Sequence, residues 1–435
     1  MISTVQARRE ALLAQYLGVL FGELDAETLA FLRLHVQWTE VAAGEALMRQ
    51  GAPGDCAYLS VGGRLRVYMN GDDGSPRPVR ELGRGELIGE MSLFTGEPRS
   101  ATVVAIRDSV LARLDKPHFE QLLARNPRAS IAVTRQIIAR LQTQHLRRPI
   151  PAPVTVALLP ASAGVDLRTF AERLAGELAS HGRVRLVDAA EVDRALDETG
   201  AAAADARDDR RVALALDAFE ADSDFVLLLA DDAVSAWTRR CVRHGDELLL
   251  LADATRPPAL HPVEQALLAG SGRSEAAQTL VLMHPAERAV PRGMRSWVTR
   301  RPVTGHINIR PELQRDMARL ARLLGRKAVG LVLAGGGARG FAHLGIWRAL
   351  RARGVEIDWV GGTSIGAVMA ALIATDAPVD RAIEVARRAF SRSPTRDYNL
   401  LPLISLIKGR RRREVVAQGI GELVGYLQKF TRANR

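Results

Sequence analysis

A serine held between two glycines is the strongest chemical feature of this 435-residue sequence. Ser364 stands in the stretch Gly362-Thr363-Ser364-Ile365-Gly366, between a segment predicted as a strand over 357–361 and an apolar helix predicted over 367–374. A strand, a G-x-S-x-G turn and a helix form the context of a nucleophile elbow. Because the glycines let strand and helix approach closely, Ser364 is predicted to expose its Oγ as the nucleophile of acyl transfer.

A glycine-rich loop lies one helix and one strand before this serine. It follows a predicted strand over 329–333 and has the pattern G-x-G-x-x-G at Gly335, Gly337 and Gly340. Acyl transfer needs hydrogen-bond donors for the developing oxyanion. The oxyanion hole is predicted at Gly336, Gly337, Ala338 and Arg339, whose backbone N–H groups and positive charge suit that role. Both loops follow neighbouring strands of one predicted sheet, so we expect them to converge.

The glycine loop alone would also fit a dinucleotide-binding protein. Such a site requires an acidic residue at the end of the second strand, about 20 positions further on. Asp358 has nearly this spacing, but it begins the predicted second strand instead of ending it. NAD binding is therefore the weaker interpretation, and the G-x-S-x-G turn argues against it.

A second group of residues suits a small anionic nucleotide. It comprises Gly89, Glu90, Arg99 and Ser100. A short helix that starts near Glu90 would offer backbone N–H groups to a phosphate, and Arg99 would pair with the same phosphate. Ser100 adds a hydroxyl donor, and Glu90 can accept from a ribose hydroxyl. The alternative is that Arg99 pairs with Glu90 or Glu97 in a fold that has lost its ligand.

The elements that position these groups fall into three predicted regions. Residues 1–148 combine flanking helices with short alternating strands and frequent glycines, which predicts an antiparallel β-barrel or jelly roll. Residues 149–153 form a proline-rich linker. Residues 154–310 alternate apolar strands with helices, which predicts a parallel sheet covered on both faces. Residues 328–435 form a further α/β region, which contains the serine. The expected fold class is thus multidomain.

Two further expectations concern single elements. One continuous helix is predicted over 116–146, from the spacing of its apolar residues. No phosphate-binding glycine loop follows the first strand of the middle region, where Pro160 to Gly164 stand instead. We therefore interpret the middle region as a scaffold or regulator and not as a nucleotide site.

The paired glycine loop and serine elbow resemble those of the patatin-like phospholipases, and residues 20–125 resemble a cyclic-nucleotide-binding domain. The whole arrangement is similar to bacterial relatives of neuropathy target esterase, including Trp237 to Cys241 and Met294 to Trp297 in the middle region. This resemblance implies a Ser–Asp dyad that hydrolyses (lyso)phospholipid acyl esters, with cAMP or cGMP as a regulatory ligand of Glu90, Arg99 and Ser100. It implies packing, not base catalysis, for His343.

The chain departs from this family at the dyad aspartate, which the resemblance places in a D-G-[GA] motif after the serine. The aspartates that follow Ser364 are Asp376, Asp380 and Asp397, and none precedes a glycine. N-capping of a helix explains the first two better. We expect a C-terminally truncated patatin-like region with little or no esterase turnover. The alternative is a catalytically inert cyclic-nucleotide sensor.

The composition of the chain excludes several further kinds of ligand and partner. Lys plus Arg is 60 against 49 acidic residues, a net charge of +11. Only four of the basic residues are lysines, and the arginines are spread along the chain without a DNA-binding motif, so no nucleic-acid partner is predicted. Two cysteines exclude a disulfide framework or zinc cluster, and no histidines have metal-ligand spacing. No metal or cofactor is predicted beyond the cyclic nucleotide.

Features near both ends of the chain indicate where in the cell the protein is expected. The N-terminus lacks the apolar core of a signal peptide, and no apolar run reaches the roughly 18 residues of a membrane span. We expect a cytoplasmic protein whose membrane contact is peripheral. The basic segment 408–435 is interpreted mainly as solvated surface, with anionic lipid headgroups as the alternative partner.

Overall fold

The computed structural model describes residues 4–22, 24–71, 73–142, 153–203, 209–267, 275–288, 293–375 and 377–390. The chain divides into two compact units, Met1–Gly325 and Arg326–Arg435. Several sequence-based expectations concern residues outside the described ranges. These are the linker residues 149–152, Asp376, Asp397 and the basic segment 408–435.

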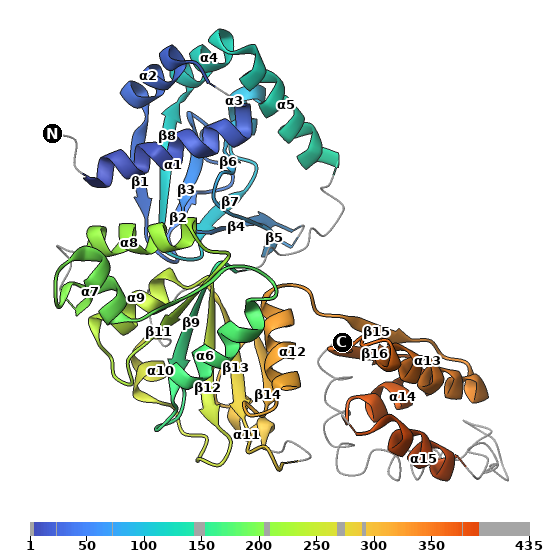
Figure 1. Cartoon of the computed structure of the whole chain (residues 1–435). Helices are drawn as coiled ribbons and strands as arrows, with labels where there is room; N and C mark the ends of the chain where they lie inside the picture. Colours follow the sequence, from blue (N-terminus) through green and yellow to red (C-terminus); the bar gives the residue numbers. More distant parts are fainter. Residues whose placement is uncertain are drawn as a thin grey trace. The chain divides into compact units, whose positions relative to one another are not determined.

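The first unit begins with an antiparallel β-barrel of jelly-roll type (Figure 1). One sheet has the order β1-β8-β3-β6 and the other β2-β7-β4-β5. Their bounds are β1 Gln37–Val41, β2 Ala46–Met48, β3 Cys56–Gly62, β4 Leu65–Asn70, β5 Pro76–Leu82, β6 Leu87–Ile88, β7 Thr102–Ala105 and β8 Ser109–Asp115. A short helix, α3 (Glu90–Thr95), lies between β6 and β7. The antiparallel pairing agrees with the alternation predicted from the sequence.

Helices cover one side of the barrel. They are α1 (Thr4–Phe21), α2 (Ala26–His35), α4 (Lys116–Arg125) and α5 (Pro127–Gln142). Their apolar residues, among them Leu13, Leu32 and Phe119, share a core with Leu59 and Leu114 of the strands.

The helix predicted over 116–146 is not continuous. It breaks at Asn126, because the residue before a proline is disfavoured in the helical conformation. Pro127 then opens α5, where its missing N–H costs nothing, and the Asn126 side chain accepts from the backbone N–H of Ala129 at 3.1 Å.

A six-stranded parallel sheet follows in the same unit, in the order β10-β11-β9-β12-β13-β14. The strands are β9 Thr155–Pro160, β10 Val184–Val187, β11 Phe225–Leu229, β12 Glu247–Asp253, β13 Ala277–Met283 and β14 Gly305–Ile309. The central strands are apolar and buried along nearly their whole length, as is usual for a sheet covered on both faces.

Helices pack on both faces of this sheet (Figure 1). Helices α6 (Leu167–Leu178) and α12 (Gln314–Leu324) share a core with Leu158 and Leu249 on one face. The other face carries Leu159 and Leu250 and is covered by the remaining helices. These are α7 Ala189–Leu196, η1 Ala201–Ala203, α8 Asp209–Ala221, α9 Ala236–His244, α10 Pro262–Leu267 and α11 Met294–Val298. The predicted covered parallel sheet is confirmed, although β14 and α12 were not expected from the sequence.

A buried group of charged residues joins the barrel to the sheet domain within this unit. Arg107, in the turn between β7 and β8, donates to the Glu220 carboxylate of α8 at 2.6 and 2.9 Å and lies 2.8 Å from Asp246. Arg84 and Arg64 of the barrel approach the same two carboxylates at 3.3 and 3.6 Å. Asp246 also accepts from the backbone N–H groups at the start of β9. The interface thus pairs barrel cations with sheet-domain anions.

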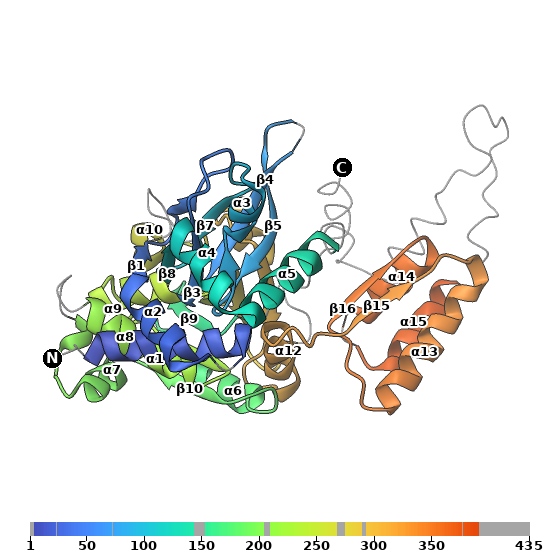
Figure 2. The ribbon, with the colours of Figure 1, turned by 90° about the horizontal axis from the view of Figure 1, so that it is seen from above.

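The second unit is a small α/β layer (Figure 2). Strands β15 (Gly330–Leu333) and β16 (Trp359–Gly362) pair in parallel, so their loops leave the same edge, as predicted. The helical segments are η2 Gly337–Gly340, α13 Phe341–Ala352, α14 Ile365–Ile373 and α15 Val379–Ala389. Their core contains Leu333, Leu344, Trp347 and Met369. The predicted multidomain fold class is confirmed.

Candidate active site and nucleotide cassette

Ser364 occupies the sharp turn between β16 and α14. Its backbone has φ 55° and ψ −124°, and it is one of three described non-glycine residues with a positive φ. A side chain held in this sparsely populated region stores strain, which functional sites tolerate when the surrounding structure enforces it. The residue is exposed. The turn therefore has the backbone geometry and exposure that a nucleophile elbow requires.

The glycines on either side explain how the turn is enforced. A Cβ built on Gly366 would lie 2.2 Å from the carbonyl oxygen of Leu333, at the end of β15. One built on Gly362 would lie 2.4 Å from the carbonyl carbon of Gly366. No side chain fits at either position, so both glycines are required for the close approach of strand, turn and helix.

The glycine loop lies directly beside the elbow. A Cβ built on Gly335 would be 3.4 Å from the Cβ of Ser364, which is ordinary van der Waals contact. Gly340 is buried, and a Cβ built on it would collide with Ile365, the residue after the serine. The loop and the elbow are thus brought together, as their positions on neighbouring strands predict.

The four residues predicted for the oxyanion hole are exposed between β15 and α13. They are Gly336, Gly337, Ala338 and Arg339. Gly337 has φ 57°, and η2 starts at this residue, so a short turn separates the loop from the helix. The backbone N–H of Arg339 donates to Gly336 O at 3.2 Å, which commits this amide to the turn. Arg339 can therefore act on a substrate through its side chain.

His343, predicted to serve in packing, has a specific polar contact. Its Nε2 lies 2.9 Å from the carbonyl oxygen of Ala334, the residue that precedes the glycine motif. No sequence pattern signals this contact, because it links the first turn of α13 back to a loop nine residues earlier.

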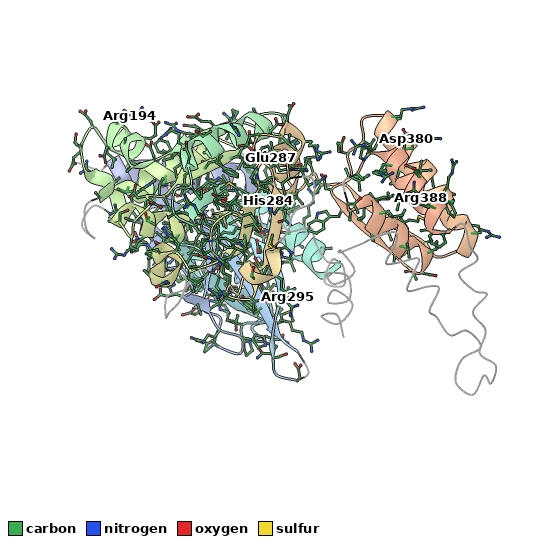
Figure 3. The ribbon with its side chains drawn as sticks, turned by 90° about the horizontal axis from the view of Figure 1, so that it is seen from below. Arg194, His284, Glu287, Arg295, Asp380 and Arg388 are labelled. Atoms are coloured by element: carbon green, nitrogen blue, oxygen red, sulfur yellow. The ribbon has the colours of Figure 1, made fainter. Side chains whose placement is uncertain are left out.

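The dyad aspartate is not identified among the described residues. Asp380 lies in the first turn of α15, with its side chain 90% exposed and 3.9 Å from Arg348. Figure 3 shows Asp380 and Arg388 on this helix. The helix is capped by Pro378 without a side-chain hydrogen bond, so the predicted capping by Asp380 is wrong. Within the described ranges, Ser364 has no hydrogen bond to a carboxylate.

The nucleotide cassette is built around Arg99 in the barrel. The Arg99 guanidinium is buried and donates to Gly89 O and to Cys56 O, both at 2.8 Å. Gly89 has φ 81°, and a Cβ there would lie 2.4 Å from Arg99 Nη1. Glu90 is fully buried at the start of α3, whereas Ser100 is exposed. The cassette residues therefore surround the β6–α3 turn.

Two neighbours of Arg99 were not predicted. The Cys56 thiol lies 3.2 Å from Arg99 Nη2, and the Asp55 carboxylate lies 3.7 Å away. A hydrogen bond to Cys56 is the main cause that lowers the pKa of Asp55. Because the two segments are 43 residues apart, sequence spacing could not reveal this contact.

The edge of the parallel sheet where nucleotide ligands usually bind is occupied by a buried ion pair. Arg301 donates to Glu264 at 2.6 and 2.8 Å and to Ala161 O, just after β9, at 3.4 Å. Both charged side chains are almost completely buried. The interpretation of the middle domain as a scaffold or regulator stays a prediction.

Neither a metal cluster nor a membrane span occurs in the part of the chain that the structure describes. The His, Cys, Asp and Glu side chains of these residues form no group of three or more that could hold a metal ion. None of their helices has the length and apolar character needed to cross a bilayer.

Comparison with known families matches all three regions. Residues 38–126 match the cyclic nucleotide-binding domain, and residues 153–324 match the neuropathy target esterase family P-loop like domain. Residues 331–429 match the patatin-like phospholipase family. The strand–elbow–helix unit with its glycine loop is therefore a patatin-like segment, and the cassette belongs to a cyclic nucleotide-binding domain.

Curated relatives match most of the chain. The chain is 35% identical to patatin-like phospholipase domain-containing protein 7 of Mus musculus over 390 residues, 78% of this chain and 28% of the relative. It is 33% identical to patatin-like phospholipase domain-containing protein 6 of Homo sapiens, in a match that covers 81% of this chain and 29% of the relative. It is 30% identical to the neuropathy target esterase sws of Drosophila melanogaster, in a match that covers 89% of this chain and 30% of the relative. The chain spans less than a third of these relatives.

The chain thus combines a cyclic nucleotide-binding domain, a neuropathy target esterase family P-loop like domain and a patatin-like segment, and it is similar to the neuropathy target esterase group of patatin-like phospholipases.

Proposed function

We propose that this protein carries a serine acyl-hydrolase centre for phospholipid or lysophospholipid esters, with Ser364 as the nucleophile. The observation that supports it most is the strained turn of Ser364, with φ 55°, so near Gly335 of the glycine loop that a Cβ built on Gly335 would lie 3.4 Å from the Ser364 Cβ. A strained, exposed serine beside the backbone donors of a glycine loop is the arrangement that acyl transfer uses.

The proposed reaction proceeds through an acyl-serine. The Ser364 Oγ forms a bond to the ester carbonyl carbon while its proton passes to a general base. The oxyanion that develops accepts from N–H groups of Gly336, Gly337 and Ala338, and the Arg339 side chain offsets its charge. The intermediate collapses with loss of the alcohol, which takes up the proton. Water then hydrolyses the acyl-serine by the same steps.

No general base for Ser364 is identified among the described residues. In the family resemblance it is an aspartate of a D-G-[GA] motif, and no such motif follows Ser364 in these 435 residues. The described candidate, Asp380, lies beside Arg348 and is exposed to solvent. A serine without its base loses several orders of magnitude in rate, although an oxyanion hole alone retains about 10³–10⁴-fold over water. We therefore expect covalent reactivity with little turnover.

Hydrolysis of a p-nitrophenyl ester and of a lysophospholipid by the whole chain tests the turnover expectation. The rate should differ little from that of Ser364→Ala. A fast rate that Ser364→Ala abolishes would show that the chain has a working base and would contradict this part of the proposal.

We further propose a cyclic nucleotide, cAMP or cGMP, as the regulatory ligand of the barrel. The support is the buried guanidinium of Arg99 at the β6–α3 turn, with Glu90 and Ser100 beside it. The proposed contacts are Arg99 and Ser100 to the cyclic phosphate and Glu90 to the ribose. Isothermal titration with each nucleotide, using Arg99→Ala for comparison, tests this part.

The second candidate is an inert sensor that binds the nucleotide but does no acyl chemistry. The engagement of Asp380 with Arg348, away from any described contact with Ser364, favours it. Saturable nucleotide binding without any covalent reaction at Ser364 would select this function over the first.

A further inference from the structure

The carbonyl group of Ala334 is the point at which three parts of the second unit meet. It follows β15 and directly precedes the first glycine of the loop. His343 of α13 contacts it at 2.9 Å through Nε2. A Cβ built on Gly366 at the start of α14 would lie 2.6 Å from the same oxygen. The Ala334 carbonyl oxygen therefore lies close to the starts of both helices.

The direction of the hydrogen bond follows from its partner. A carbonyl oxygen only accepts, so Nε2 of His343 must carry the proton. The neutral Nε2–H tautomer and the doubly protonated ring both meet this requirement.

Fixing this carbonyl also fixes the glycine loop. The Ala334 C=O and the Gly335 N–H belong to one planar peptide group, so holding the oxygen towards His343 and Gly366 sets the plane from which the loop departs. Gly335 lies beside Ser364, since a Cβ built on this glycine would be 3.4 Å from the Ser364 Cβ, and Gly336 and Gly337 come next in the loop. Glycines have more backbone freedom than other residues, so this loop needs an external anchor to keep its N–H groups aligned.

We propose that His343 is a positioning residue, which aligns the oxyanion loop with Ser364 by donating to the Ala334 carbonyl. The proposal rests on the proposed acyl chemistry of Ser364. It gives His343 a structural role in the loop, because its Nε2–H donates to a backbone carbonyl.

The test uses four full-length variants and two measurements. His343→Gln keeps an N–H donor at similar reach, His343→Leu removes it, Ile346→Ala changes a half-exposed residue one turn further along α13, and Ser364→Ala removes the nucleophile. One measurement is the rate constant for labelling Ser364 with a fluorophosphonate. The other is deuterium uptake by peptides that contain Leu333 to Gly340. Thermal unfolding identifies any variant that fails to fold.

We expect His343→Leu to lower the labelling rate about tenfold, the upper range for one lost hydrogen bond, and to raise deuterium uptake in the loop. His343→Gln and Ile346→Ala should stay within about threefold of the parent chain. Equal behaviour of His343→Leu and the parent would overturn the proposal. So would an equal loss in His343→Gln, because packing of the ring would then be the cause.

The two proposals can fail separately. If the parent chain shows no labelling at Ser364, the acyl-hydrolase proposal fails for this chain. Deuterium uptake still decides whether His343 holds the loop, because this readout needs no reaction. Altered uptake in His343→Leu with an unaltered labelling rate would refute a role in positioning the oxyanion donors.

Discussion

Arg107 of the barrel and Glu220 of the sheet domain form a two-pronged ion pair with donor–acceptor distances of 2.6 and 2.9 Å, and both side chains are at most 3% exposed. Thr155, at the start of β9, donates its hydroxyl to the same carboxylate. Attraction to the Arg107 charge overcomes the effect of burial and lowers the pKa of Glu220 to about 2. This pair joins the nucleotide-binding barrel to the P-loop like domain.

Replacing Arg107 should destabilise the first unit strongly. Arg107→Met takes the nearest cation from the buried Glu220 and Asp246 carboxylates and leaves them only Arg84 and Arg64, at 3.3 and 3.6 Å. Breaking a buried ion pair costs about 3–5 kcal/mol, and the two remaining arginines should keep the loss at or below that range. Urea unfolding of the whole chain measures this loss. Arg77→Met is the matched control, because its ion pair with Asp73 is exposed to solvent and should contribute little to stability. Similar losses in the two variants would show that the buried pair does not hold the interface.

The carboxyl group of Asp217, unlike that of Glu220, should make the folded state less stable as the pH rises. Burial and then the Glu220 charge raise its pKa to about 6, from an ordinary value of 3.8. The folded state therefore binds this proton more tightly, and the stability it contributes at low pH is lost as the pH rises from about 4 through 6.

Asp217→Asn removes this dependence. As the pH rises from about 4 to 7, the free energy of unfolding of Asp217→Asn should increase relative to that of the parent chain. The increase should be below about 3 kcal/mol, because Asp217 is partly accessible to solvent. Urea titrations across this range measure the difference, with the exposed Asp222→Asn as control. A difference that does not change with pH would mean that Asp217 ionises as readily when folded.

The elbow glycines offer a matched pair of substitutions. Gly366→Ala would place a Cβ 2.2 Å from the backbone oxygen of Leu333, so the turn must distort. Gly361→Ala on β16 meets nothing within 4 Å and needs no unusual φ. We expect Gly366→Ala to abolish labelling by a fluorophosphonate and to lower the unfolding temperature. Gly361→Ala should keep the labelling rate and the unfolding temperature of the parent chain. Labelling of Gly366→Ala at the parent rate would contradict the enforced elbow.

Arg99 should govern nucleotide affinity. A hydrogen bond to a charged group contributes about 1.5–3 kcal/mol, so Arg99→Ala should weaken cyclic-nucleotide binding by about 10–150-fold. Arg113→Ala is the control, because Arg113 also lies near Asp55, at 3.8 Å, but outside the proposed contacts. Isothermal titration measures both. Arg99 also donates to Cys56 O and Gly89 O, so its replacement can weaken the fold. Thermal unfolding of Arg99→Ala is therefore measured together with its nucleotide affinity. Equal affinity in Arg99→Ala and the parent would remove Arg99 from the site.

Local patterns predicted much of this architecture. The G-x-S-x-G turn between a strand and a helix was sufficient to predict the elbow, because close packing admits only glycine at Gly362 and Gly366. Apolar strands alternating with helices predicted the parallel sheet. The break at Asn126 was missed although Pro127 signals it, because the apolar spacing continues across the break.

Contacts between distant segments were beyond prediction from the sequence. The pairing of Arg107 with Glu220 joins residues 113 positions apart, and neither residue lies in a motif. The contact between Arg99 and Cys56 depends likewise on how strands of the barrel lie together. One sequence specifies such contacts only through the complete packing, which spacing rules do not describe.

The proposed function depends above all on Ser364 acting as a nucleophile, and covalent trapping of this residue shows whether it does. The whole chain and Ser364→Ala are incubated with a fluorophosphonate, and the adduct is located by mass spectrometry of the peptides. We expect a slow, single adduct on Ser364 that is absent from the folded variant. Absence of an adduct, or equal labelling of the variant at another residue, would contradict it.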